Sequence, residues 1–308
     1  MRLVIDKRPK SGSPRKPSSL YPFTVEVVDA ATTDDLKLAI AKQVQTLRPD
    51  RQRLTTSEKA VLEAGVALAK HSLGDGDTVY VKDLGPQIGW QTVFYIEYAG
   101  PIVLHYLVYN LQNLFYGQTF EHSLVQQCAY FMVMGHFIKR ELETAFVHRF
   151  SHGTMPLFNV FKNSGHYHIL SGLNLAYWVY SPDTAQGTAR AAELGRPLLL
   201  AVFVGVFLFA ELSNLSTHIT LRNLRPPGSR VRRIPRGYGF GLVSVPNYTF
   251  EILAWAAFTA VTRSLAAVLF LAVASAQMYV WAAKKHAQYR LEFPDYPKSR
   301  KALIPFVV

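Results

Sequence analysis

Long apolar runs are confined to one part of this chain. Residues 88–283 carry nearly all of them, whereas residues 1–85 show the mixed pattern of a soluble domain. Apolar stretches at 88–109, 122–138, 167–180, 197–212, 240–259 and 265–283 approach the ~20 residues that a helix needs to cross a bilayer. The pattern predicts a multi-span α-helical membrane bundle of about six to seven transmembrane helices in residues 86–308. Because the 240–259 stretch contains Pro246, the last two stretches could instead form one re-entrant hairpin.

The first 85 residues alternate between strand and helix patterns. Residues 2–6 and 23–27 predict strands, and Thr33 begins a helix whose apolar positions recur at helical spacing until Pro49 ends it. Two further strands are predicted at 53–55 and at 78–81, the latter after a Gly-Asp-Gly-Asp turn. This β-β-α-β-β order resembles ubiquitin-like α+β domains. Since no exposed Gly-Gly tail follows, docking or a structural role is expected rather than conjugation.

Lysine and arginine are unevenly distributed among the loops. Residues 110–121 contain neither, whereas 139–162 contain four and the connection 222–236 is rich in arginine. Cytoplasmic loops carry the excess of positive charge, so the pattern predicts that both ends of the chain lie in the cytosol. Charged residues interrupt the first apolar residues too early for a signal peptide, which agrees with a cytosolic N-terminus.

The overall charge narrows the choice of partners. The formal net charge is +12 and there is one cysteine, Cys128. An excess of positive charge favours phosphate-bearing ligands or an anionic membrane leaflet. Nucleic acid is not an expected partner, because the basic residues lie in loops between predicted spans. A single cysteine excludes an internal disulfide and a cysteine-rich metal site.

Several polar residues interrupt the apolar runs. Asn247 and Glu251 are spaced to share one helix face, with Tyr248 beside Glu251. Glu97 and Glu211 also lie within predicted spans, and the predicted topology places them all toward the cytosolic side. An ionisable residue within a span usually faces the protein interior and marks a functional site. We therefore expect one polar cavity; the alternative is a helix start capped by Asn247, with Glu251 reaching toward the interface.

Three segments, 214–225, 246–251 and 286–306, resemble the C-terminal domain of the steroid 5-alpha-reductase family. Residues 96–101, residues 146–156, the ubiquitin-like head and Tyr248 are similar to its branch of very-long-chain trans-2-enoyl-CoA reductases of fatty acid elongation. Steroid reductases typically have an aspartate where His218 stands and a residue other than tyrosine where Tyr248 stands. Both departures favour an enoyl-CoA substrate over a steroid.

The resemblance implies NADPH-dependent reduction of a long-chain trans-2-enoyl-CoA. It assigns proton donation to Tyr248, and a phenol, with an ordinary pKa of about 10, is protonated at neutral pH. It places Glu97 against the reacting carbonyl, either directly or by orienting Tyr248. Lys139, Arg140 and Glu143 match further positions of the family; a cation there could hold CoA phosphates or the thioester oxygen, although Arg140 could equally be a positive flank of its span.

The resemblance also implies a cofactor site. Arginine suits the adenosine phosphate of NADPH, and no Gly-x-Gly-x-x-Gly follows a strand, so the cofactor would lie inside the helical bundle. No metal is expected: His148 and His152 have the spacing of a metal pair on a helix, but Gly153 and Pro156 favour a loop. The residues implied for NADPH are Asn214, His218, Arg222, Arg225, Asn247, Glu251, His286 and Tyr289.

The implied setting is the endoplasmic reticulum membrane, with the active site facing the cytosol. Expected partners are membrane lipid and the other elongation enzymes, namely the elongase, ketoacyl reductase and dehydratase. Three alternatives remain open: a steroid or polyprenol reductase of the same superfamily, an isoprenylcysteine-type methyltransferase, and a non-catalytic scaffold whose head recruits partners.

Overall fold

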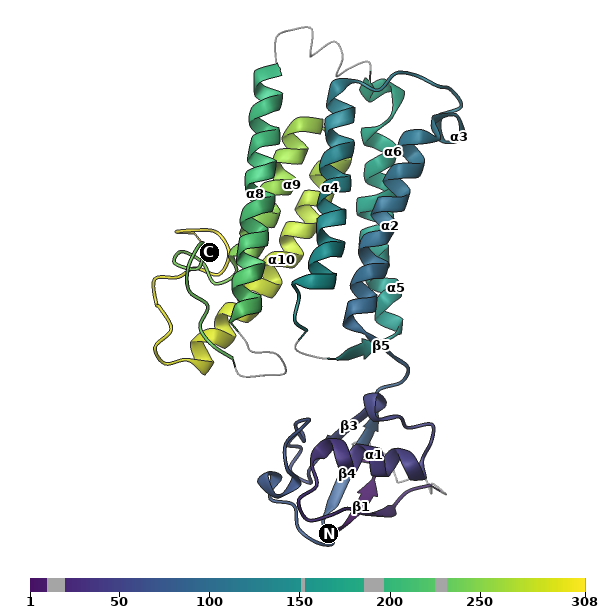
Figure 1. Ribbon diagram of the computed structural model, residues 1–308, viewed down its shortest axis with the longest axis vertical. Helices are drawn as coiled ribbons and strands as arrows, with labels where there is room; N and C mark the ends of the chain where they lie inside the picture. The colour runs from purple at the N-terminus through teal and green to yellow at the C-terminus, as the bar shows by residue number, and fades with distance from the viewer. Residues whose placement is uncertain (10–19, 151–152, 186–196, 225–231, 308) are drawn as a thin grey trace. The chain divides into compact units, whose positions relative to one another are not determined.

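The computed structural model describes residues 1–9, 20–150, 153–185, 197–224 and 232–307 (Figure 1). The chain forms two compact units. The first comprises Met1–Trp90 with His152–Asn159, and the second comprises Gln91–Ser151 with Val160–Val308. Among the predicted site residues, Arg225 lies outside the described residues, and so does His152.

The first unit contains a four-stranded mixed sheet with strand order β2-β1-β4-β3. Strands β1 and β4 are parallel, and the two outer pairings are antiparallel, with Leu3 opposite Val25 and Leu54 opposite Val81. A separate two-stranded antiparallel sheet joins β5 to β6. The elements are β1 (Arg2–Asp6), β2 (Phe23–Glu26), α1 (Thr33–Gln43), β3 (Gln52–Thr55), β4 (Thr78–Asp83), β5 (Gln87–Gly89) and β6 (Thr154–Pro156).

The core of this unit follows the predicted pattern. Alternate strand residues such as Leu3 and Ile5 are fully buried and pack with Leu36 and Ile40 from α1. All five elements expected from the sequence are present in the expected order. The helix ends at Gln43, however, and Pro49 begins a short 3-10 helix instead, because the chain leaves α1 early to bury Val44 and Leu47. The likeness to ubiquitin remains a prediction.

The start of α1 carries a capping box. The Asp35 carboxylate accepts hydrogen bonds from the Thr32 backbone N–H (2.8 Å) and hydroxyl (2.7 Å), and the Asp35 N–H donates to Thr32 Oγ1 at 3.3 Å. These hydrogen bonds lower the pKa of the Asp35 carboxyl below its ordinary value. A carboxyl with a depressed folded-state pKa stabilises the fold above its unfolded pKa, and this contribution is lost as the pH falls through the folded value.

We therefore expect amide protection in the first turn of α1 to decrease as the pH falls below about 4. Hydrogen exchange on the full chain measures this directly. The Asp35→Asn variant should lose the pH dependence, because its side chain has no carboxylate to protonate. Asp34→Asn is the matched control, since it changes the adjacent acidic residue of the same turn outside the capping box. The same pH dependence of amide protection in both variants would contradict the assignment of this effect to the Asp35 carboxyl.

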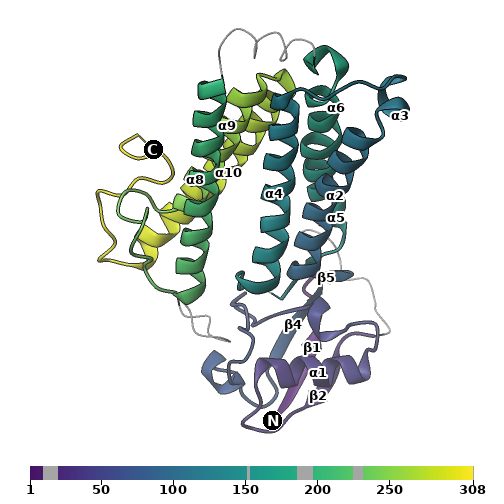
Figure 2. The ribbon, with the colours of Figure 1, turned by 45° about the horizontal axis from the view of Figure 1, so that its top comes forward.

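The second unit is helical (Figures 1 and 2). Helices α4, α8, α9 and α10 pack together, and α9 contacts each of the other three. The buried core includes Phe137, Phe207, Trp255 and Phe258. The helices are α2 (Trp90–Asn110), α3 (Gln112–Tyr116), α4 (Leu124–Phe146), α5 (Phe158–Ser164), a π-helix (Gly165–Asn174), α6 (Leu175–Val179), α8 (Pro197–Asn223), α9 (Pro246–Thr262) and α10 (Leu265–Glu292).

Helical structure is found within every apolar range that the sequence singled out. Within the described residues, α8 and α10 are long and apolar enough to cross a membrane, and large apolar side chains such as Leu198 and Leu265 are exposed along them. The number of spans remains a prediction. Helix α9 begins at Pro246 rather than near residue 240, because proline lacks an N–H and suits the first helical position. Gly239 precedes it at φ +77°, where an added Cβ would lie 2.7 Å from Pro246 Cβ.

Helix α2 is tied closely to the π-helix. His168 Nε2 lies 2.8 Å from the carbonyl oxygen of Ile96, and the His168 ring passes so close to Gly100 that an added Cβ would lie 1.9 Å from it. Pro101 follows inside the same helix. Because proline has no N–H, it leaves the carbonyl of residue 97, four positions earlier, without its usual helical donor. These contacts fix the turn of α2 that carries Glu97.

Candidate functional site

A stripe of charged and polar residues runs along one face of α4. His136, Lys139, Arg140 and Glu143 stand at positions i, i+3, i+4 and i+7, so they share that face. They meet polar residues of α8 and α9, the two helices that pack against α4. We call the resulting group the ionic cluster; it comprises His136, Lys139, Arg140, Glu143, Glu211, Asn214, His218 and Glu251.

Lys139 connects α4 to α8. Its Nζ lies 2.8 Å from Glu211 Oε2, donates to Asn214 Oδ1 at 2.8 Å and lies 3.4 Å from Glu143 Oε1. Asn214 then extends the connection to α9, because its Nδ2 donates to the Asn247 carbonyl at 2.9 Å and to Glu251 Oε2 at 3.1 Å. The amine is thus engaged inside the cluster.

Arg140 connects α4 to α2. Its Nη2 donates to the Tyr98 hydroxyl at 2.9 Å, and its Nη1 pairs with Glu143 and lies 3.2 Å from His218 Nδ1. The guanidinium also lies 5.1 Å from the centre of the Tyr98 ring. Glu143 is almost fully buried, so this charge-assisted pairing compensates for its lost hydration.

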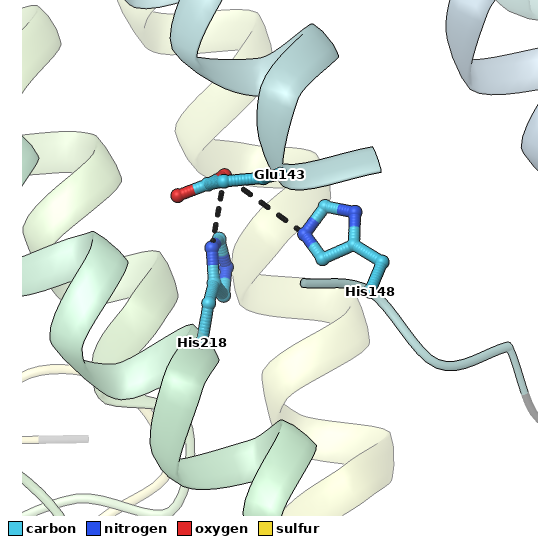
Figure 3. A group of neighbouring side chains, drawn as sticks. All are labelled: Glu143, His148 and His218. Carbon is cyan, nitrogen blue, oxygen red and sulfur yellow. Dashed lines mark ion pairs between the residues drawn. The ribbon is translucent and has the colours of Figure 1, made fainter. Parts of the chain in front are cut away.

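Glu143, His148 and His218 converge on one point at the end of α4 (Figure 3). Glu143 Oε2 lies 3.1 Å from His218 Nδ1 and 3.9 Å from His148 Nε2. Burial and the positive charge of Arg140 lower the pKa of the His148 imidazole to about 3, so it is neutral. The three donor atoms lie within 4.8 Å of one another, a spacing that suits a metal ion. Arg140, however, already contacts Glu143 and His218 there.

Glu97 lies on α2 and is 2% exposed. The Asn163 side chain hydrogen-bonds to its carboxylate, and Arg140 is near enough to interact with it electrostatically. Its Oε1 atom is buried and has no hydrogen-bond partner among the described residues. Glu97 therefore borders the ionic cluster through Arg140 and keeps one acceptor available.

Tyr248 lies in the first turn of α9, three residues before Glu251. Its ring packs against Val245, Ala282 and Leu303, and Arg140 and Glu251 both act on it electrostatically. Within the parts of the chain that the structure describes, the Tyr248 hydroxyl makes no hydrogen bond, and the Glu251 carboxylate is bonded to Asn214 and Trp255 instead. The phenol remains available for a ligand.

The remaining predicted residues do not join the ionic cluster. His286 and Tyr289 belong to a second group around Ser244, whose Oγ lies 2.6 Å from both His286 Nδ1 and the Tyr296 hydroxyl. Tyr289 stacks on Tyr296, with ring centres 5.4 Å apart. Arg222 is exposed at the end of α8. The structure thus brings most of the predicted residues together and separates these three from them.

His136 and Tyr98 carry no predicted role, and Glu211 is expected only as part of the polar cavity, yet each contacts a predicted site residue. His136 Nδ1 lies 2.8 Å from Glu211 Oε1, and its Nε2 lies 3.3 Å from Glu251 Oε1. A signal for His136 was present in the sequence, because it stands one helical turn before Lys139 on the same face. Nothing in the spacing reveals its partners, which lie on other helices.

The cluster places three carboxylates among two permanent cations and two histidines in a largely apolar bundle. Such an arrangement is costly to bury unless each charge is paired. Two acceptors, Glu97 Oε1 and Asn247 Oδ1, are buried without a partner among the described residues. With the free Tyr248 hydroxyl, they give the site groups that can bind and protonate a polar ligand.

Comparisons with known proteins find a matching family model and several similar reductases. The family model described as 3-oxo-5-alpha-steroid 4-dehydrogenase matches residues 153–308. A putative enoyl reductase of Schizosaccharomyces pombe is 52% identical over 85% of this chain and 87% of its own length. A very-long-chain enoyl-CoA reductase of Dictyostelium discoideum is 43% identical, with 91% and 93% covered. A probable very-long-chain enoyl-CoA reductase of Caenorhabditis elegans is 40% identical, with 92% and 99% covered.

Proposed function

The chain belongs to the steroid 5-alpha-reductase family, in its branch of very-long-chain enoyl-CoA reductases, and on this premise we propose that it reduces trans-2-enoyl-CoA with NADPH. The reaction consumes the enoyl-CoA, NADPH and one proton, and yields the saturated acyl-CoA and NADP⁺. It is the last step of the very-long-chain fatty acid elongation cycle.

The ionic cluster is the observation that carries this proposal. Reduction of an α,β-unsaturated thioester develops negative charge on the thioester oxygen, and fixed charges and dipoles in a water-poor site stabilise such charge well. Arg140 and Lys139 are held in place by Glu143, Glu211 and Asn214. A non-catalytic scaffold would have no need to bury so many charges in an apolar bundle.

The residues present fit NADPH. The nicotinamide carboxamide both donates and accepts hydrogen bonds, and Asn247 Oδ1, which is buried without a partner in the described part of the chain, can accept from it. Asn214 and Glu251 extend the same polar surface. Arg222, at the exposed end of α8, suits the adenosine phosphate, with Arg225 following it in the chain. His218 contacts Arg140, while His286 and Tyr289 would contribute from the group around Ser244.

NADPH, when bound, supplies the hydride that reduces the β-carbon. Tyr248 donates its phenolic proton to the α-carbon, since its hydroxyl is not committed to another described residue. Glu97 faces the thioester carbonyl or orients Tyr248. Arg140 lies close enough to interact electrostatically with both Glu97 and Tyr248, so it stabilises the negative charge that forms between them.

Product analysis with isotopically labelled NADPH tests the proposed function. Purified protein, a long-chain trans-2-enoyl-CoA and NADPH carrying deuterium as the transferred hydride should give acyl-CoA labelled at the β-carbon. An enone steroid and a polyprenol substrate serve as parallel arms, because the matched family model carries a steroid dehydrogenase description. Turnover of the steroid or polyprenol without turnover of the enoyl-CoA would overturn the proposal.

We place this reaction at the endoplasmic reticulum membrane, with both chain ends and the site on the cytosolic side. The two long apolar helices among the described residues support a membrane setting. The elongase, ketoacyl reductase and dehydratase of the same cycle are the expected partners, because they supply the enoyl-CoA and take up the acyl-CoA product.

A further inference from the structure

His136 is the buried member of the ionic cluster that the proposed function leaves without a role. It lies on α4 with 3% of its surface exposed. Its two ring nitrogens face carboxylates on different helices: Nδ1 lies 2.8 Å from Glu211 Oε1 on α8, and Nε2 lies 3.3 Å from Glu251 Oε1 on α9. One side chain therefore joins three helices at the site.

The two ring nitrogens have different carboxylate partners. A carboxylate oxygen accepts hydrogen bonds, so a ring N–H directed at it is a suitable donor. Nδ1 lies within hydrogen-bonding distance of Glu211, and Nε2 lies within ion-pairing distance of Glu251. Glu211 also has Lys139 at 2.8 Å, whereas within the described ranges His136 is the only basic side chain within ion-pairing distance of Glu251.

The ring is itself held firmly. It lies edge-on to Trp255, with ring centres 4.9 Å apart, and to Phe137 at the same distance. Trp255 Nε1 also donates to Glu251 Oε1 at 3.2 Å, and Asn214 Nδ2 donates to Glu251 Oε2 at 3.1 Å. Both oxygens of Glu251 are thus held by side chains from three helices, and His136 is the contact from α4.

We propose that His136 is a positioning residue that fixes the Glu251 carboxylate for the nicotinamide carboxamide of NADPH. The inference rests on the proposed function, which assigns Glu251 to the cofactor. His136 itself touches neither cofactor nor substrate. Its contact with Glu211 holds the imidazole ring in place. Its contact with Glu251 fixes the orientation of the carboxylate that would face the cofactor.

Two substitutions separate the two contacts. The amide nitrogen of asparagine can take the place of histidine Nδ1, so His136→Asn keeps a donor for Glu211 and loses the one for Glu251. The longer glutamine places its amide nitrogen near the position of Nε2, so His136→Gln keeps the donor for Glu251 instead. Both variants are neutral and each loses one of the two carboxylate contacts, so a merely structural role would affect them equally.

NADPH binding to the full-length, detergent-solubilised protein, measured by fluorescence titration without acyl substrate, is the deciding readout. We expect His136→Asn to raise the NADPH Kd by about tenfold or more and His136→Gln to raise it by less than about threefold. His105→Gln is the control: His105 is also buried with two partners, Tyr180 and Ser171, but lies outside the cluster. It should lower the melting temperature and leave the NADPH Kd unchanged.

Equal weakening by the two His136 variants, or no weakening by His136→Asn, would overturn the inference. A weaker NADPH Kd in His105→Gln would overturn it too, because any loss of packing would then suffice. Failure of the proposed function has a different signature: the unmodified protein would not bind NADPH or would not reduce enoyl-CoA. Wild-type binding and turnover with indistinguishable His136 variants would count against His136 alone.

Discussion

Replacing Tyr248 with phenylalanine is expected to lower kcat for enoyl-CoA reduction by at least about 100-fold, the effect of losing a positioned proton donor. The phenylalanine ring can keep the packing against Val245, Ala282 and Leu303, so folding should be preserved. The NADPH Kd should change little, because the proposal gives the phenol no cofactor contact. Steady-state kinetics and NADPH titration on the same preparation measure both quantities.

Tyr279→Phe is the matched control for this substitution. Tyr279 lies on α10 and is 46% exposed, so loss of its hydroxyl should leave kcat unchanged. A Tyr248→Phe protein with full turnover would exclude Tyr248 as the proton donor. Equal losses in the two variants would show that the assay responds to general damage rather than to the missing proton.

The second large effect is expected at Glu143. Glu143→Gln removes the buried carboxylate that pairs with Arg140 and Lys139, and breaking a buried pair by removing one partner costs about 3–5 kcal/mol. We therefore expect a clear fall in thermal stability together with loss of turnover. Glu141→Gln, two residues earlier on the same helix and outside the cluster, should be nearly neutral in both measurements.

A double variant separates stability from chemistry at this position. Removing both charges in Arg140→Met with Glu143→Gln leaves fewer unpaired charges, so part of the stability should return. Turnover should not return, because Arg140 is proposed to stabilise charge on the substrate. Recovery of turnover along with stability would show that the pair serves the fold only.

Much of the site could be predicted from the sequence because its residues follow helical spacing. Asn247 and Glu251 on α9, and Lys139, Arg140 and Glu143 on α4, are grouped by periodicity alone. The pairings between helices could not be predicted in this way. Lys139 finds Asn214 and His136 finds Glu211 only because α4 and α8 pack side by side at one particular register.

The fold was predictable to a similar extent. The strands and helix of the first unit follow from alternation and from turn residues, and the apolar ranges of the second unit contain helices. The π-helix over Gly165–Asn174 has no such signal in the sequence, and contacts with other helices, such as that between the Ser171 carbonyl oxygen and His105 Nε2, become visible only in the fold. The separate group of Ser244, His286 and Tyr296 likewise depends on where the chain returns after α10.

Pro101 has a consequence for how the turn of α2 around Glu97 is held. The carbonyl that it leaves without a helical donor belongs to Glu97, the residue proposed to face the thioester. Contact between His168 and Ile96 holds the backbone just before this point. The turn that carries the acid is therefore secured by a neighbouring helix rather than by its own helical hydrogen bond, so the position of Glu97 depends on the π-helix staying in place.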